Sequence, residues 1–189
     1  MGKGWRLAED IRDAGGSVAA VYAIDRLFHH SGSPARRRRK KGGPDHAIGR
    51  SRGGLSTKIH AVVDQDGLPV RLLISPGQAS DMGAVPQLLE GLPVPSTVVA
   101  DRGYDSNAVL DLIARSGARP NIPSCSRRIV RRSVDPAIYR QRNLIERFFC
   151  KLKQFRRVAT RFDKLARNFL AAVLIASTRL WLRAYESTP

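Results

Sequence analysis

The hydrophobic positions of this chain first form short runs that are typical of β-strands. Residues 17–25 and 96–101 are largely apolar, and each run ends in a carboxylate, which predicts two buried strands. Residues 55–64 alternate between polar and apolar side chains, and residues 68–75 follow directly after the turn sequence Asp64-Gln-Asp-Gly67. This second pattern predicts an antiparallel hairpin.

Helical periodicity accounts for most of the remaining apolar positions. We expect helices over residues 81–90, capped by Ser80 or Asp81, over residues 107–116 and over residues 169–185, with a last short strand at 118–123. The last helix has these residues available for packing: Leu170, Val173, Leu174, Leu180 and Trp181. The predicted element order is that of a ribonuclease-H-like α/β domain: three strands, a helix, a strand, a helix, a strand and a long helix. The predicted fold is a mixed five-stranded sheet flanked by helices, with a C-terminal helical extension.

The domain is expected to span residues 17–185, between a short N-terminal segment of residues 1–16 and a tail of residues 186–189. Residues 26–46 combine Gly, Pro and Ser with a run of arginines, which is typical of a basic linker-like insertion. A phosphate-binding arm and a plain solvated loop are equally good interpretations of this insertion.

The long predicted helix at residues 139–153 is basic and carries one acidic residue in its middle. At about 100° per residue, one face of this helix combines a phenol, two cations and a carboxylate: Tyr139, Arg142, Glu146 and Lys153. The opposite face is apolar: Leu144, Ile145, Phe148, Leu152 and Phe155. The helix is therefore predicted to bury one face and to present Glu146 between cations on the other.

The charge of the chain indicates a polyanionic partner. Thirty-three Lys and Arg against sixteen Asp and Glu give the 189 residues a formal charge of +17, and the hydrophobic content of 42% is sufficient for a folded core. Most of the cations are arginines, which suit phosphate, so DNA or RNA is the expected partner. A basic protein without chemistry, of ribosomal or chromatin type, explains the composition at least as well.

Cysteine usage and apolar run length favour a cytoplasmic protein. Cys125 and Cys150 lie far apart in the chain, so neither a disulfide framework nor a zinc site is expected. The longest apolar run, residues 169–175, is too short to cross a bilayer, and no apolar leader with a cleavage site is recognisable. We therefore expect no membrane association.

Three acidic residues stand where the predicted fold can bring them together. Asp25 and Asp101 end strands that can be neighbours, and a helix carrying Glu146 can cross close to both. Carboxylates held together repel one another unless a divalent cation compensates them, and oxygen ligands favour Mg²⁺ or Mn²⁺. Two such ions would activate a hydroxyl nucleophile and stabilise the leaving oxygen of a phosphodiester. Taken alone, Asp25 is more simply explained as a turn or cap residue.

Two spaced motifs contain the second and third of these acids. One is Tyr139-x-x-Arg142-x-x-x-Glu146-x-x-x-x-x-x-Lys153, and the other is Asp101-Arg-Gly-Tyr-Asp-Ser. They resemble the Y-(2)-R-(3)-E-(6)-K signature and the second-aspartate motif of DDE transposases from bacterial insertion sequences, families four and five. Further segments are similar to the family-five branch: residues 47–61, 75–81 and 155–169. The resemblance covers roughly residues 19–182.

The resemblance implies a metal-dependent DNA transposase domain. The acids that would bind two Mg²⁺ or Mn²⁺ ions are Asp25, Asp101 and Glu146. The residues that would contact DNA near the cleaved position are Tyr139, Arg142 and Lys153. The implied reaction is hydrolytic nicking that leaves a 3′-hydroxyl, followed by attack of that hydroxyl on target DNA. The implied partners are terminal inverted repeats, target DNA and a second copy of the chain, in a bacterial nucleoid.

Two departures from the family bear on activity. Members usually carry a helical DNA-binding region upstream of the first aspartate, whereas 24 residues precede Asp25, so an N-terminally truncated copy is expected. Residues 26–39 differ from the tract that family members have at this place. With suitable codons, the same stretch of the gene read one nucleotide later would encode the family tract, so we hypothesise a local frameshift. The leading alternative function is a catalytically inactive DNA-binding remnant or regulator, and a basic RNA-binding protein is a more distant one.

Overall fold

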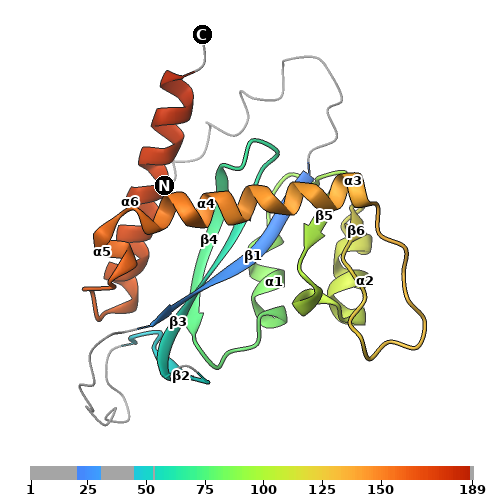
Figure 1. Cartoon of the computed structure of the whole chain (residues 1–189), viewed down its shortest axis with the longest axis horizontal. Helices are drawn as coiled ribbons and strands as arrows, with labels where there is room; N and C mark the ends of the chain where they lie inside the picture. The colour runs from blue at the N-terminus through green and yellow to red at the C-terminus, as the bar shows by residue number, and fades with distance from the viewer. Residues whose placement is uncertain (1–20, 31–44, 53, 188–189) are drawn as a thin grey trace.

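The computed structural model describes residues 21–30, 45–52 and 54–187 (Figure 1). For residues 21–30 the description covers the backbone. The predicted N-terminal segment of residues 1–16, the start of the first predicted strand and residues 31–44 of the predicted insertion lie outside the described residues.

Six strands of the described chain form one mixed sheet. They are β1 (Val21–His30), β2 (Gly49–Ser51), β3 (Gly54–Val63), β4 (Pro69–Pro76), β5 (Thr97–Ala100) and β6 (Arg119–Asn121). β1 runs antiparallel to β3 and parallel to β5, and β6 continues the sheet parallel to β5. The mixed α/β architecture is confirmed. The described sheet has one strand more than predicted, because the short β2 pairs with the start of β3. The remainder of β3 pairs with β4.

Helices surround this sheet, and the long C-terminal helix is confirmed (Figure 1). They are α1 (Val85–Leu89), α2 (Asn107–Arg115), α3 (Pro136–Tyr139), α4 (Asn143–Lys153), α5 (Arg156–Ala159) and α6 (Ala166–Glu186). Short 3₁₀ helices stand before α1, α2 and α4: η3 (Met82–Ala84), η4 (Arg102–Tyr104) and η5 (Arg140–Arg142). The helix predicted over residues 139–153 is thus helical throughout, with η5 as a tighter turn near its start.

β3 separates two hydrophobic cores. Ile59, Ala61 and Val63 pack against α4, α5 and α6 on one face of the sheet. Val62 belongs to the second core, which β5 and the helices α1 and α2 complete on the other face. Because both faces of the sheet are covered, the molecule has three layers, and every residue of β3 from position 56 to 63 is buried.

Two of the polar residues buried on β3 bind side chains of a neighbouring loop and strand. Lys58 Nζ pairs with Asp81 Oδ1 at 2.9 Å, and His60 Nε2 lies 2.7 Å from Ser75 Oγ. Asp81 therefore does not cap a helix as predicted; its side chain makes no capping hydrogen bond. The start of the predicted helix at 81–90 is also wrong, because the segment begins as the 3₁₀ turn η3 and α1 spans only Val85–Leu89.

β1 does not end at Asp25 as predicted, but continues to His30. The additional residues pair antiparallel with β3, from Arg26 opposite His60 to His30 opposite Ser56. The long partner strand therefore extends β1 through a segment whose own sequence carries no strand signal. Asp25 lies inside a strand, and residues 26–30 belong to the sheet rather than to a linker-like insertion.

A buried arginine, Arg161, links the segment that precedes α6 to the segment that precedes β2. Arg161 donates hydrogen bonds to the carbonyl oxygens of His46 and Ala47, and its guanidinium lies 4.5 Å from the centroid of the Phe169 ring. Burial lowers the pKa of Arg161 to about 10, although Asp45 acts in the opposite direction. Ala47 and Arg161 both adopt a positive φ, of 44° and 46°, which is uncommon for residues other than glycine.

The packing of α6 agrees with the prediction in part. Val173 and Leu180 are buried as expected, and Trp181 donates its indole N–H to the carbonyl oxygen of Pro69 at 2.9 Å. Leu174, which was also expected to pack, is 46% exposed. No helix in the described part of the chain is long and apolar enough to cross a membrane.

Substitution of Phe148 tests how α4 is held on the sheet. Phe148 is 1% exposed within the core formed by β3, α4 and α6, so we expect Phe148→Ala to lower the free energy of unfolding by about 3–5 kcal/mol. Urea denaturation followed by circular dichroism measures this change. Leu174→Ala on the exposed side of α6 is the control, and a similar loss in both variants would contradict this description of the core.

Candidate active site

The backbone register places Asp25 and Asp101 next to one another. β1 and β5 are parallel, with Ile24 paired to Ala100. The residue that follows each member of this pair is an aspartate, Asp25 or Asp101. Position 25 is also opposite Ala61 of β3, whose side chain belongs to the core beneath α4. The side chain of Asp25 itself lies outside what the structure describes.

Asp101 leaves the sheet at the start of η4. Its Oδ1 accepts a hydrogen bond from the backbone N–H of Arg102 at 2.6 Å. Val98 and Ala100 pack into the core that contains α1 and α2. Because side chains alternate along a strand, the next position, Asp101, follows on the opposite side of the sheet, which is the side that α4 covers. The Asp101 side chain is partly exposed.

Glu146 approaches the same region from α4. This helix packs on β1 and β3, while η5 before it contacts β1 and β5, and Figure 1 shows α4 crossing β1. The side chain of Glu146 is 49% exposed, and its Oε1 accepts a hydrogen bond from Arg142 Nη2 at 2.6 Å. α4 therefore brings a third carboxylate across the strand that contains Asp25.

The predicted common face of Tyr139, Arg142 and Glu146 is present as direct contacts. The Arg142 guanidinium carbon lies 5.9 Å from the centroid of the Tyr139 ring, while the same guanidinium pairs with Glu146. Lys153 is exposed at the end of α4, seven residues and therefore about two helical turns after Glu146. The opposite, apolar face packs into the core through Ile145, Phe148 and Leu152, as predicted.

A complete cluster of metal ligands is not seen among the described side chains. No three His, Cys, Asp or Glu residues within that set lie close enough together to hold a metal ion. The predicted cluster requires Asp25, whose side chain is not part of that set. The metal-binding role of Asp25, Asp101 and Glu146 stays a prediction.

Asp105 is an important residue of this region that the sequence reasoning did not single out. Its side chain is fully buried, and it binds Arg128 Nε at 2.8 Å, the backbone N–H of Cys125 at 2.7 Å and the guanidinium of Arg132. Burial raises the pKa of a carboxyl, but these hydrogen bonds outweigh burial and lower the pKa of Asp105 to about 2. Asp105 thus ties the loop after β6 to the turn that begins at Asp101.

The sequence signal that could have indicated this role of Asp105 is the motif in which it stands. Asp105 is the second acid of Asp101-Arg-Gly-Tyr-Asp-Ser, and an arginine-rich segment follows at residues 127–132. The sequence separation between Asp105 and Arg128 conceals that they meet, because β6 and its flanking turns must form before the two are adjacent.

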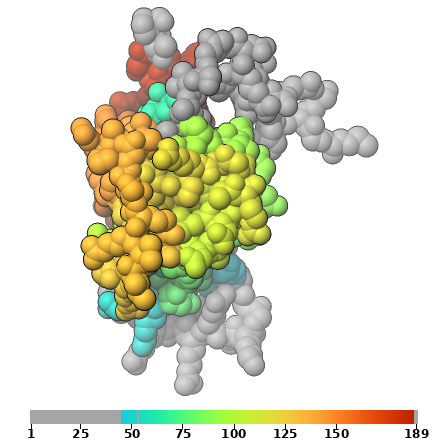
Figure 2. Space-filling view, turned by 90° about the vertical axis from the view of Figure 1, so that its right-hand side faces the viewer, coloured from blue at the N-terminus to red at the C-terminus, as the bar shows by residue number. Residues whose placement is uncertain are grey.

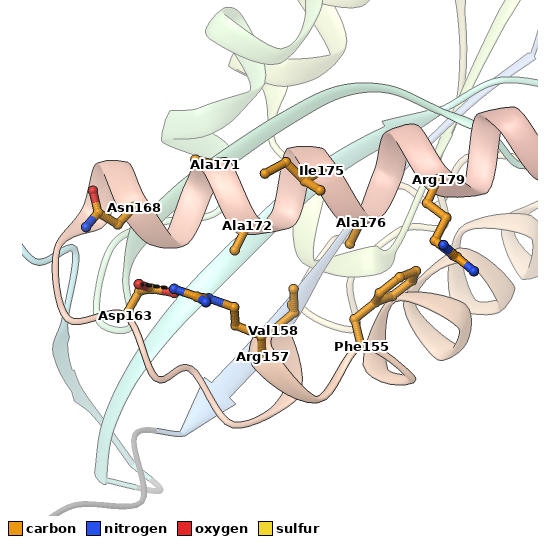
Figure 3. A pocket seen from close by; sticks show the side chains of 10 residues that line it. All are labelled: Phe155, Arg157, Val158, Asp163, Asn168, Ala171, Ala172, Ile175, Ala176 and Arg179. Atoms are coloured by element: carbon orange, nitrogen blue, oxygen red, sulfur yellow. Dashed lines mark hydrogen bonds and ion pairs between the residues drawn. The ribbon is translucent and has the colours of Figure 1, made fainter.

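A separate hollow lies between α5 and α6 (Figure 3). It measures about 520 Å³, and its lining is largely apolar, with Val158, Ala172 and Ile175 among the residues drawn. At one end Arg157 pairs with Asp163, with 3.0 Å between Nε and Oδ2. None of its lining residues is one of the predicted metal or DNA ligands, so this hollow is not the site of the expected chemistry.

Comparison with known proteins settles the family. The family model of the transposase DDE domain matches residues 21–181. The chain belongs to the DDE transposase family. Residues 21–181 are accordingly its catalytic domain, and members of this family generally use divalent metal ions and bind DNA. The predicted family is confirmed.

Two curated relatives carry names from insertion sequences. A Brucella ovis protein named as a transposase for insertion sequence element IS6501 is 38% identical over 130 residues, which cover 68% of this chain and 100% of that protein. The transposase for insertion sequence element IS1106 from Neisseria meningitidis serogroup B is 46% identical over 52 residues, which cover 28% of this chain and 18% of that protein.

Replacement of Asp105 by Asn tests the buried network. Because the pKa of Asp105 is depressed from 3.8 to about 2, its charge stabilises the folded state above about pH 4, and this stabilisation is lost as the pH falls through 2. We expect Asp105→Asn to cost about 2 kcal/mol of unfolding free energy at neutral pH, with a difference from the wild type that shrinks in acid.

Thermal and urea unfolding across the acid range measure this effect. Asp111→Asn, an exposed position on α2, serves as the matched control and should leave the stability unchanged. A wild-type advantage over Asp105→Asn that is the same at pH 2 and at pH 7 would contradict the assignment.

Proposed function

We propose that this transposase domain cleaves DNA at the ends of an insertion sequence and joins the resulting 3′-hydroxyl to target DNA. The observation that carries the proposal is the parallel register of β1 and β5, in which Asp25 and Asp101 each follow the Ile24–Ala100 pair. α4 crosses β1 with Glu146 in its first turn. The names of the two relatives supply the insertion-sequence context.

The donor set fits a pair of Mg²⁺ or Mn²⁺ ions. Asp101 and Glu146 are partly or half exposed carboxylates, so their oxygens are accessible to an ion. Neighbouring carboxylates of this kind attract hard divalent cations. Asp25, Asp101 and Glu146 would hold the ions, which when bound supply activation of a hydroxyl and stabilisation of the leaving oxygen.

The chain's own cations prepare the site for DNA. Arg142 is held between the Tyr139 ring and Glu146, which restricts the orientation of its guanidinium and prepares it for binding a phosphate. Lys153 extends the same face of α4 toward the end of the helix. Tyr139, Arg142 and Lys153 are therefore proposed to contact the DNA strand beside the cleaved bond.

The finer features of the fold follow the same proposal. A sheet whose first long strand lies between an antiparallel and a parallel neighbour, with a helix crossing it, is the arrangement of a ribonuclease-H-like domain. We assign residues 17–185 to this domain. Terminal inverted repeats and target DNA would be its substrates, and two copies of the chain would act together on the paired ends.

Substitution of Glu146 tests the catalytic assignment. We expect Glu146→Gln to abolish Mg²⁺- or Mn²⁺-dependent nicking of a plasmid that carries the element ends, because the amide replaces an anionic ligand. Binding of Mn²⁺, followed by electron paramagnetic resonance, should weaken in the same variant. Glu90→Gln, an exposed acid after α1, is the control and should match the wild type.

The possible results separate the two functions that were considered. Equal nicking by the wild type and by Glu146→Gln would contradict the catalytic role. DNA binding without nicking in either protein would support the inactive remnant.

Two lysines of α4 test the DNA-contacting face. Lys151 and Lys153 are both exposed near the end of the helix, but at about 100° per residue only Lys153 shares the face of Glu146. We expect Lys153→Gln to reduce the dependence of DNA affinity on salt by about one unit of slope, as expected for one lost phosphate contact. Lys151→Gln is the control, and equal slopes in the two variants would contradict the proposed orientation.

A further inference from the structure

The loop between β6 and α3 has an apolar tip surrounded by arginines. Residues 126–133 read Ser-Arg-Arg-Ile-Val-Arg-Arg-Ser, so that two arginines stand on each side of an Ile-Val pair. Ile129 is 100% exposed and Val130 is 78% exposed. In Figure 1 this loop projects at the right-hand side of the molecule, and in Figure 2 its yellow-orange atoms run along the left edge of the described surface.

The buried Asp105 holds this loop in place. Arg128 and Arg132, the second arginine of each pair, both bind its carboxylate. The backbone adds a bond from the Arg132 N–H to Ser124 Oγ at 2.9 Å, and one from the Arg128 N–H to the Cys125 carbonyl oxygen at 3.1 Å. The loop is therefore attached to the domain core by charged and backbone hydrogen bonds.

This attachment divides the four arginines into two that bind Asp105 and two that do not. Arg127 and Arg131, the first arginine of each pair, are exposed on either side of the tip. Neither makes an ion pair among the described residues. The loop thus offers two cations and, between them, two adjacent aliphatic side chains to whatever lies outside.

The loop is also coupled directly to the helix that carries Glu146. Asn121 and Asp135 close its base by exchanging hydrogen bonds of 3.0 and 3.2 Å. Asp135 then caps α3, which continues through η5 into α4. The position of the loop relative to the domain is therefore linked to the start of the helical segment that carries Glu146.

We propose that residues 126–133 form a DNA wedge, which rests on the proposed function of this domain. Arg127 and Arg131 bind phosphates, and Ile129 and Val130 insert between base steps near the cleaved end. Exposed aliphatic side chains beside arginines are the chemistry of proteins that unstack and kink DNA. Burial between bases also removes from water the apolar surface that the free protein leaves exposed at the tip.

Two double variants separate the phosphate contacts from the wedge. Arg127→Gln/Arg131→Gln should lower the salt slope of duplex binding by about two units, one for each lost phosphate contact. Ile129→Ser/Val130→Ser should keep this slope but lose the unstacking of bases. Both variants change exposed side chains, so thermal unfolding should match that of the wild type.

Unstacking is measured with a duplex that carries fluorescent aminopurine at a central TA step, which is easily deformed. At saturating protein and without metal, wild-type binding should raise the fluorescence several-fold, and Ile129→Ser/Val130→Ser should abolish the rise. The matched controls on α6 are Leu182→Ser and Arg183→Gln, which alter an exposed leucine and an exposed arginine. Both controls should behave as the wild type.

Each result bears on the wedge independently of catalysis. No rise in fluorescence with the wild type, or an equal rise with Ile129→Ser/Val130→Ser, overturns the wedge. An unchanged salt slope in Arg127→Gln/Arg131→Gln overturns the phosphate contacts, and stronger binding to an RNA duplex of the same sequence overturns the choice of DNA. Because no metal is present in these binding experiments, failure of the cleavage assignment at Glu146 would appear in the nicking and Mn²⁺-binding assays and not here.

Discussion

The pairing of β1 with two strands of opposite direction is the constraint on which this structure depends. β3 pairs antiparallel with β1 from Ala23 to His30, whereas β5 pairs parallel with the first residues of β1, 21–24. The parallel pairing sets Asp25 beside Asp101, and the antiparallel pairing sets position 25 opposite Ala61 under α4. The two pairings of β1 thus position Asp25 relative to Asp101 and relative to α4, the helix that carries Glu146.

The packing of α4 on the sheet orients the side chains of the candidate site. The buried face of α4 contributes Ile145, Phe148 and Leu152 to the same core as Ile59 and Ala61 of β3. Because these contacts fix the rotation of the helix about its axis, the side chains on its opposite, polar face cannot turn into the core. Glu146 and Arg142 are consequently held at the surface of the sheet side that also carries Asp101.

In a chain with a formal charge of +17, the few acids determine which arginines are available for DNA. Asp105 immobilises Arg128 and Arg132, and Glu146 orients Arg142. Arginines that are paired in this way shape a loop or a helix face, whereas the neighbouring Arg127 and Arg131, which have no ion pair within the described part of the chain, are exposed. A carboxylate lost from this arrangement would change the shape of the basic surface as well as its charge.

Some features of this protein could be read from the sequence because they depend on near neighbours. The hairpin at residues 64–67, the strand before Asp101 and the amphipathic face of α4 follow from turn chemistry and periodicity, which act over a few residues. The spaced motif around Glu146 identified the family for the same reason. Pairing between distant segments was decided only in the tertiary structure.

β1 continues past Asp25 because β3 supplies hydrogen bonds to residues 26–30. The Asp81 side chain does not cap the helical turn that follows it, because it pairs with the buried Lys58. Asp105 became the anchor of a loop only when β6 brought Arg128 within reach. Desolvation and long-range pairing have no local signature in the sequence, which is why these contacts required the fold.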